Sequence, residues 1–102
     1  MRSILITFSV FFLTTLSVAG QGIEFYHGTW EEAILKAKAE DKIIFVDAYT
    51  TWCGPCKRMA ASTFPDPAVG ELFNQHFLSL KIDMEKEMGL EFRKKFPVNA
   101  YP

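Results

Sequence analysis

An uninterrupted apolar stretch near the middle of the chain restricts the possible fold more than any other feature of the sequence. Ile43-Ile44-Phe45-Val46 continues through Asp47 to Ala48-Tyr49, without the alternation of apolar and polar residues that marks a strand with one solvated face. Such a run is typical of a parallel strand that is covered on both faces. A single acid, Asp47, interrupts it.

Helices are predicted on both sides of this strand. Thr29 and Glu32 form a capping box, and apolar residues at helical spacing follow them, which predicts a helix to about Glu40. A second helix is predicted to begin at the cysteine motif and to end at about Ser62. Pro55 is compatible with this helix, because the first helical turn tolerates a proline.

Weaker patterns fill the rest of the chain. They predict a short first strand at 23–26, a helix from Asp66-Pro67 to about Gln75, a strand at 77–82, a solvated charged connection, and a helix at 89–96. The side chains expected on inward faces are Phe64, Val69, Leu72, Phe73, Phe77, Leu90, Phe92 and Phe96. Strands that alternate with helices predict an α/β fold, a βαβαβα unit with a parallel core sheet and right-handed crossovers.

The N-terminal segment is predicted to be a targeting signal. One positive charge at Arg2 precedes an apolar and hydroxyl run from Ile4 to Val18, and small residues follow it, which is typical of a secretory signal peptide over residues 1–19. The run is shorter than the roughly 20 apolar residues that span a bilayer, although an uncleaved membrane anchor is the alternative. A buried core helix is disfavoured because the run has no polar face. Residues 20–102 then form one domain of an exported protein.

The balance of charge argues against one class of partner. The chain has 11 basic and 12 acidic residues, which gives no electrostatic reason to expect nucleic acid. Contact with a membrane is expected only if the N-terminal segment is uncleaved.

The two cysteines, Cys53 and Cys56, are interpreted as a redox pair. A structural disulfide is the usual use of two cysteines in an exported chain, but this pair would close a loop too short to restrict the unfolded chain much. Half of a zinc site is the other alternative, and it needs two further ligands. His27 and His76 are isolated in the sequence, so no metal is expected. The aromatic residues fall on the predicted inward faces, so no cofactor is expected either.

Cysteines at a helix start have unequal roles. Cys53 is expected to be exposed at the positive end of the helix dipole, which favours the thiolate that attacks disulfides. Cys56, one turn further in and less exposed, would resolve the mixed disulfide. Lys57 and Arg58 are interpreted as solvated charges and left out of the catalytic set.

Two other residues near the pair are candidates for the site. Asp47 stands six residues before Cys53 in an apolar strand, where an unpaired carboxylate is costly, and it is interpreted as a general base that deprotonates Cys56 through water. The alternative is an acid at the strand end that faces solvent or caps a loop. Trp52 would be an apolar platform beside Cys53, or a surface aromatic that covers the helix start.

The segment from Asp47 to Lys57, with Trp52-Cys53-Gly54-Pro55-Cys56 at its centre, closely resembles the active-site segment of the thioredoxin family. The segments 63–69 and 77–83 are similar to thioredoxin-like domains of bacterial envelope reductases. The resemblance covers residues 25–102 and implies a thioredoxin-like fold that lacks its C-terminal hairpin and last helix. It also implies that Pro102, approached through Tyr101, is the cis-proline that faces the cysteines and the substrate.

One departure from the family pattern concerns the acid. The family often places a lysine opposite it, whereas the alignment of Ile82-Asp83 with the family's strand puts Ser79 there. The pair Gly54-Pro55 resembles that of the reducing members of the family.

The resemblance implies a thiol-disulfide oxidoreductase that reduces protein disulfides in the bacterial periplasm or cell envelope through a Cys53/Cys56 dithiol-disulfide cycle. Its partners would be protein disulfide substrates and an upstream thiol reductant. An oxidase or isomerase of the same fold is one alternative. A non-catalytic binding or assembly module is the other, and the presence of both cysteines counts against it.

Overall fold

The computed structural model describes residues 3–4, 9–11 and 21–102. The predicted signal peptide, residues 1–19, lies almost wholly outside the described residues. Within those ranges, none of the helices has both the length and the apolar character needed to cross a bilayer.

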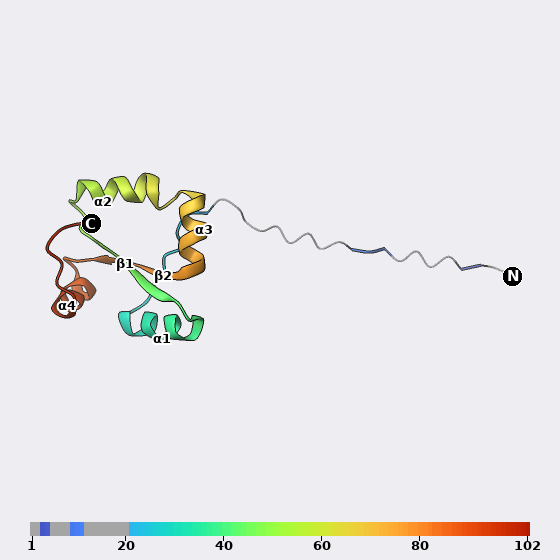
Figure 1. The fold of residues 1–102 in the computed structure, drawn as a ribbon, viewed down its shortest axis with the longest axis horizontal. Helices are drawn as coiled ribbons and strands as arrows, with labels where there is room; N and C mark the ends of the chain where they lie inside the picture. The colour runs from blue at the N-terminus through green and yellow to red at the C-terminus, as the bar shows by residue number, and fades with distance from the viewer. Residues whose placement is uncertain (1–2, 5–8, 12–20) are drawn as a thin grey trace.

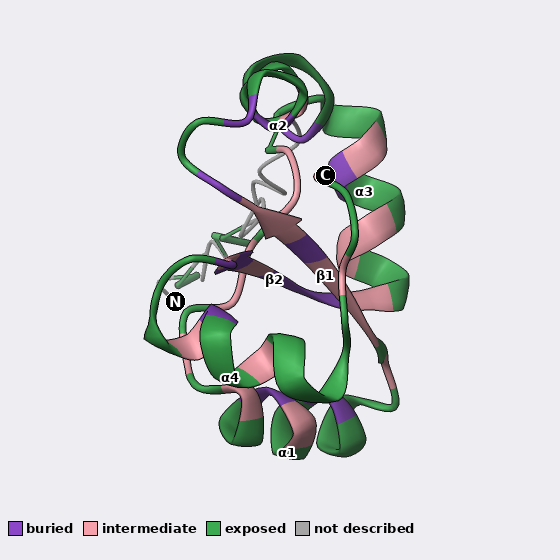
Figure 2. Ribbon diagram, turned by 90° about the vertical axis from the view of Figure 1, so that its left-hand side faces the viewer, coloured by how far each residue is buried: buried purple, intermediate pink, exposed green. Residues whose placement is uncertain are grey.

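Helices enclose a small parallel sheet (Figure 1). In chain order the elements are α1 (Trp30–Glu40), β1 (Ile43–Tyr49), α2 (Gly54–Arg58), a π-helical turn (Met59–Thr63), α3 (Pro67–His76), β2 (Phe77–Asp83) and α4 (Glu87–Lys95). Figures 1 and 2 show the sheet between two helical layers, with α1 and α4 on one side and α2 and α3 on the other. The predicted α/β architecture with a parallel core sheet is confirmed.

The two strands are unequally buried. β1 and β2 pair in parallel from Ile43 opposite Phe77 to Tyr49 opposite Asp83. Most of β2 is buried, whereas β1 is mainly half-buried (Figure 2). The expectation that β1 is covered on both faces is therefore only partly met. Among the described residues, β1 pairs with β2 alone, while β2 also contacts the segment around Phe25.

The predicted first strand is reduced to a single bridge between Phe25 and Ser79. The neighbouring backbone groups pair elsewhere: the Ile23 N–H donates to the Phe64 carbonyl at 2.8 Å, and the Glu24 N–H donates to Asn74 Oδ1 at 2.8 Å. Because these partners lie at the end of the π-helical turn and on α3, no second ladder along β2 forms.

Local capping fixes where the helices begin. The capping box is present, since Thr29 Oγ1 accepts the Glu32 N–H at 3.1 Å and the Glu32 carboxylate accepts the Thr29 N–H. Asp66 Oδ1 accepts the N–H groups of Ala68 and Val69 at 2.9 and 3.2 Å and so caps α3. The helix that begins after Cys53 continues through its π-helical part to residue 63, one residue beyond the predicted end.

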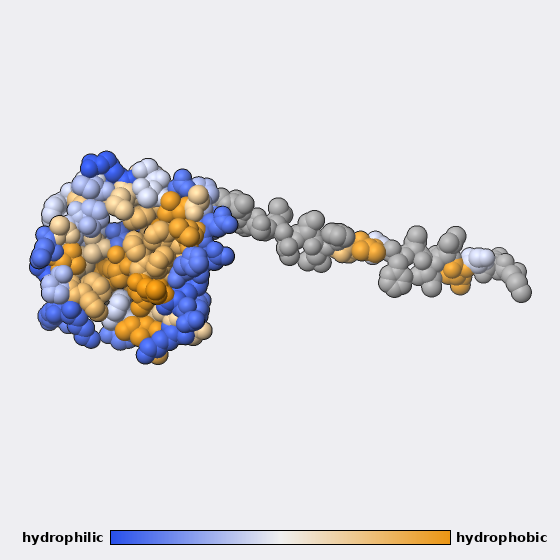
Figure 3. All heavy atoms as spheres, in the orientation of Figure 1, coloured by the Kyte–Doolittle hydropathy of each residue, from blue (hydrophilic) through white to orange (hydrophobic). Residues whose placement is uncertain are grey.

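The core forms between the sheet and α1. Its buried members are Ala33, Ala37, Leu78, Leu80, Ile82 and Met84. Three residues predicted to face inward are instead exposed: Leu72 at 55%, Leu90 at 44% and Phe96 at 46%. Each lies on a helix, or just beyond its end, and that helix turns another face to the sheet. The prediction from helical spacing alone was therefore wrong for these three residues. In Figure 3 apolar side chains still gather over the middle of the domain, with hydrophilic residues around them.

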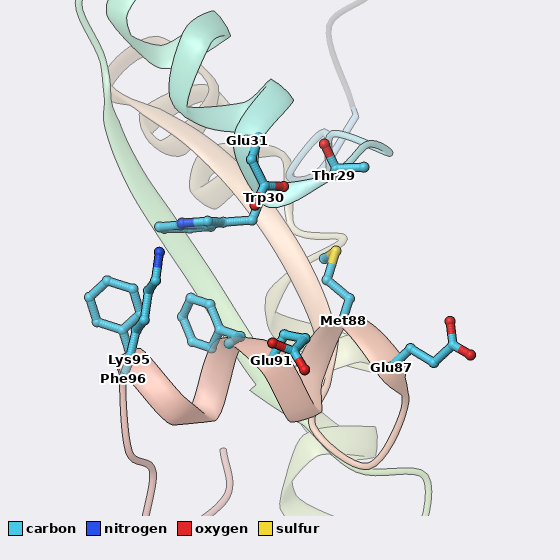
Figure 4. A pocket seen from close by; sticks show the side chains of 9 residues that line it. Thr29, Trp30, Glu31, Glu87, Met88, Glu91, Lys95 and Phe96 are labelled. Carbon is cyan, nitrogen blue, oxygen red and sulfur yellow. The ribbon is translucent and has the colours of Figure 1, made fainter.

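Aromatic stacking holds α4 against α1. The Trp30 ring packs edge to face on Phe92 and Phe96, with centroids 5.1 and 5.6 Å apart. Figure 4 shows the cavity of about 370 Å³ beside these rings, between the two helices.

Candidate active site

The two cysteines lie where β1 leads into α2. Cys53 is the N-cap of α2, and its Sγ accepts the backbone N–H of Cys56 at 3.1 Å. The two residues are joined by a disulfide, with Cα atoms 5.3 Å apart. A cysteine pair that spans the first turn of a helix can cycle between disulfide and dithiol without rearrangement of the helix, because both sulfurs are already adjacent.

The burial of the cysteines differs from the sequence expectation. Cys53 was expected to be the exposed member, yet it is 3% exposed and Cys56 is 5% exposed. The Cys53 sulfur turns back over the first helical turn to its partner and to the Cys56 N–H, which removes it from solvent. The chemical asymmetry between the sulfurs therefore comes from their position on the helix rather than from exposure.

Asp47 is buried and paired with a lysine. Its side chain lies opposite Lys81 in the register of β1 and β2, and Lys81 Nζ is 3.3 Å from Asp47 Oδ2. The alignment that placed Ser79 opposite the acid is wrong, because Ser79 pairs with Phe45, two residues earlier on β1. The alternative of an acid that faces solvent is wrong as well, since Asp47 is 5% exposed.

Three aromatic rings surround the Lys81 ammonium. Nζ lies 5.0 Å from the ring centroid of Phe25, 5.2 Å from that of Tyr49 and 5.3 Å from that of Phe64. Ring faces attract a cation, so they compensate part of the hydration that the partly buried ammonium loses. This aromatic cage holds the charge of Lys81 beside Asp47.

A cavity connects the acid to the second cysteine. It has a volume of about 230 Å³ and is lined by Asp47, Tyr49, Thr50, Thr51, Cys56, Lys57, Ala60 and Lys81. A water molecule occupies roughly 30 Å³ of liquid, so the cavity has room for several waters between Asp47 and Cys56. The arrangement permits proton transfer between these two groups through water.

The environment of Tyr49 changes its titration. Burial raises the pKa of the Tyr49 phenol, and the carboxylates of Asp83 and Asp47 raise it further. The hydroxyl in the cavity wall is therefore neutral around pH 7.

Trp52 is held from two directions although its side chain is 66% exposed. Its indole Nε1–H donates to Glu85 Oε1 at 2.6 Å, and its ring packs edge to face on Tyr101 with centroids 6.1 Å apart. Glu85 belongs to the charged connection between β2 and α4, which was predicted to be solvated. A signal for its role was present in the sequence, since an acid two residues beyond a strand end can reach residues that follow the neighbouring parallel strand.

The remaining predicted residues surround the pair from two segments. The Tyr101–Pro102 peptide bond is cis, as the resemblance implied, and the end of the described chain lies beside the start of α2 (Figure 1). Gly54 and Pro55 are exposed. A side chain at Gly54 would meet only the end of Arg58, so internal packing does not require glycine there. Lys57 and Arg58 are exposed, and neither forms an ion pair with a described residue.

The described residues offer no metal site: no group of three or more His, Cys, Asp and Glu side chains among them could hold an ion.

Comparison with known proteins places this geometry in context. The family model Thioredox_DsbH, described as a protein of unknown function, DUF255, matches residues 9–93. The chain is similar to Thioredoxin-1 of Drosophila melanogaster, with 34% identity over 64 residues, which are 63% of this chain and 55% of the fly protein. It is also similar to the thiol:disulfide interchange protein DsbD of Pseudoalteromonas atlantica, with 28% identity over 72% of this chain and 12% of that protein.

Solved structures show the same fold. A solution structure from Bacteroides thetaiotaomicron, of a protein proposed to be a disulphide-isomerase, is 52% identical, has a TM-score of 0.69, and matches over 81% of this chain and 69% of that chain. A thioredoxin from Thermus thermophilus matches with a TM-score of 0.68 over 80% of this chain and 62% of that chain, at 22% identity.

Proposed function

The chain belongs to the thioredoxin family of thiol-disulfide oxidoreductases, and on that premise we propose that it reduces protein disulfides in the bacterial cell envelope through a Cys53/Cys56 cycle. The observation that carries this proposal is the cysteine pair itself, with Cys53 as N-cap and the Cys56 N–H directed at its sulfur. In the dithiol form that N–H and the helix dipole favour a Cys53 thiolate.

The reaction balances without a cofactor. The Cys53 thiolate attacks one sulfur of the substrate disulfide, and the other substrate sulfur leaves with the electron pair and takes up a proton. Cys56 then loses its proton and attacks Cys53 Sγ, which breaks the mixed disulfide and releases the second substrate thiolate, which is protonated in turn. The protein is oxidised to the disulfide, the substrate is reduced to two thiols, and an upstream thiol reductant regenerates the dithiol.

Asp47 is the proton acceptor in the second step. It lines the same cavity as Cys56 and is held by Lys81, so its carboxylate has a fixed position relative to the resolving cysteine. The neighbouring surface is suited to an extended substrate. Trp52 and Tyr101 offer aromatic faces beside the cysteine pair, and Gly54, Pro55 and Pro102 are exposed around it.

The envelope location rests on two observations. The N-terminal sequence is typical of a signal peptide, and a relative is the interchange protein DsbD. Export is tested by N-terminal sequencing of the protein from a periplasmic fraction. A mature N-terminus close to residue 20 supports the proposal, and an intact Met1 in the cytoplasm contradicts it.

Two variants test the chemistry in the full-length protein. Reduction of insulin should proceed with wild type and be abolished in Cys53→Ser, whereas Cys56→Ser should accumulate a mixed disulfide with its substrate. Mass spectrometry of the trapped complex from an envelope fraction identifies the substrate. A wild type that reduces no disulfide would contradict the catalytic proposal and favour a binding module.

A second candidate is disulfide isomerisation, favoured by the 52% identical structure from Bacteroides thetaiotaomicron. The reduction potential of the Cys53/Cys56 couple separates the two. A reductase should lie near the thioredoxin value of about −270 mV, whereas a value near −180 mV favours isomerase activity and one near −120 mV favours oxidation.

A further inference from the structure

A buried hydroxyl next to the redox pair has no protein partner. Thr50 is 1% exposed, and its Oγ1 forms no hydrogen bond with any described residue. Leaving a buried hydroxyl without a hydrogen-bond partner destabilises a protein. Buried groups of this kind are normally satisfied by ordered water.

A cavity beside Thr50 offers a candidate partner for its hydroxyl, namely a water molecule in that cavity. Thr50 lines the cavity that also contains Asp47 and Cys56, and this cavity has room for water. Ser79 is equally buried and also lacks a partner among the described residues, but it is not one of the described residues that line the cavity. Of the two, only Thr50 can take part in the chemistry at Cys56.

The hydrogen bonds of a water between Cys56 and Asp47 give Thr50 a specific role. A water that carries a proton from Cys56 to Asp47 accepts the thiol proton and donates one hydrogen to the carboxylate, so its second hydrogen needs an acceptor. The Lys81 and Lys57 ammonium groups in the cavity wall are donors only, whereas the Thr50 hydroxyl can accept. Tyr49 and Thr51 also line the cavity and carry hydroxyls, but Tyr49 is only half-buried and Thr51 is exposed, whereas Thr50 is buried.

We propose that Thr50 is a positioning residue whose hydroxyl orients the water that transfers a proton from Cys56 to Asp47. This inference rests on the proposed dithiol-disulfide cycle and concerns only its second step. When Cys56 attacks Cys53 Sγ, its proton moves to the water and a water proton moves to Asp47, while the substrate sulfur leaves with the electron pair. Thr50 changes neither charge nor bonding and does not contact the substrate.

The test separates the two steps of the cycle. The reduced full-length protein reacts with a chromogenic aromatic disulfide, which releases one coloured thiolate when Cys53 attacks and a second when Cys56 resolves the intermediate. Thr50→Val replaces the hydroxyl with a methyl group of similar shape, Thr50→Ser keeps the hydroxyl, and Ser79→Ala is the matched control that removes a buried hydroxyl outside the cavity.

At pH 7 Thr50→Val should slow the second release about ten-fold and leave the first within about two-fold, because only the second step uses the general base. The deficit should fade at alkaline pH, where Cys56 ionises without help from Asp47. Thr50→Ser should restore most of the rate, and Ser79→Ala should alter neither phase. A purely structural role would slow both phases at every pH.

The inference is overturned if Thr50→Ser is as slow as Thr50→Val, or if the two phases slow equally. If Thr50→Val does not fold, a high-resolution structure of the wild type decides: an ordered water bonded to Thr50 Oγ1 supports the role, and a dry hydroxyl contradicts it. Wild-type protein that releases no thiolate would instead contradict the proposed function, so the two failures are distinguishable.

Discussion

Trp52 donates its indole N–H to Glu85 at 2.6 Å and thereby joins the residue before the redox pair to the connection between β2 and α4. The strands that precede these residues, β1 and β2, are neighbours in the sheet. The hydrogen bond therefore joins the two segments that follow the carboxyl ends of these strands. An exposed indole that would otherwise change rotamer is held in one orientation, against Tyr101.

Removal of this acceptor should loosen Trp52. In Glu85→Ala we expect a lower steady-state fluorescence anisotropy of Trp52 and a several-fold loss of insulin reduction, while Glu85→Gln, which keeps an acceptor oxygen, should lose less. The measurement is made in a Trp30→Phe background, because the chain has 2 tryptophans. Glu91→Gln, an exposed acid on α4, is the control, and an equal loss in it would contradict the assignment.

The ion pair between Asp47 and Lys81 should stabilise the fold, and a double-mutant cycle should measure a coupling energy between the two residues. Lys81→Met leaves a carboxylate that is 5% exposed without its cation, and we expect a loss of about 1–3 kcal/mol in the free energy of unfolding. Asp47→Asn in the same chain should recover part of that loss. Chemical denaturation at neutral pH measures all four proteins of the cycle, and additive effects would show that the pair is not coupled.

The aromatic cage should contribute through the lysine charge rather than through burial alone. Phe25→Leu should lower the free energy of unfolding more in wild type than in the Lys81→Met background, with a difference of about 0.5–1 kcal/mol. Phe77→Leu is the control, because Phe77 packs with Phe45 and Phe73 and not on the lysine. Identical losses in the two backgrounds would remove the cation–π explanation.

The raised pKa of Tyr49 predicts a specific alkaline effect. Burial first, then Asp83 and Asp47, raise this pKa above its ordinary value of 10.0, so the folded state favours the neutral phenol. The stabilisation linked to Tyr49 is fully present below about pH 10 and is lost as the pH rises through the folded-state pKa. In the disulfide form, wild type should therefore lose stability above pH ~10 more steeply than Tyr49→Phe. Parallel curves of unfolding free energy against pH would contradict the shift.

Local sequence determined much of the framework. The capping box at Thr29 and the Asp66-Pro67 start of α3 placed the beginnings of two helices, because capping uses groups within one turn. The cysteine motif, with a proline that the first turn tolerates, placed the beginning of α2. The apolar runs located both strands, because the pattern that marks a strand also lies within a few consecutive residues. Cys53, Cys56 and Asp47 were candidates from the sequence alone. The structure joins the two cysteines by a disulfide and places Asp47 and Cys56 on one cavity.

The partners of these residues were decided only by tertiary structure. Lys81 faces Asp47 because of the register between two strands that are far apart in sequence, and a shift of two residues is what separates it from the expected Ser79. Glu85 meets Trp52 for the same reason. The exposure of Leu72, Leu90 and Phe96 depends on which face each helix turns to the sheet, a choice made by packing between elements rather than by the residues of one element.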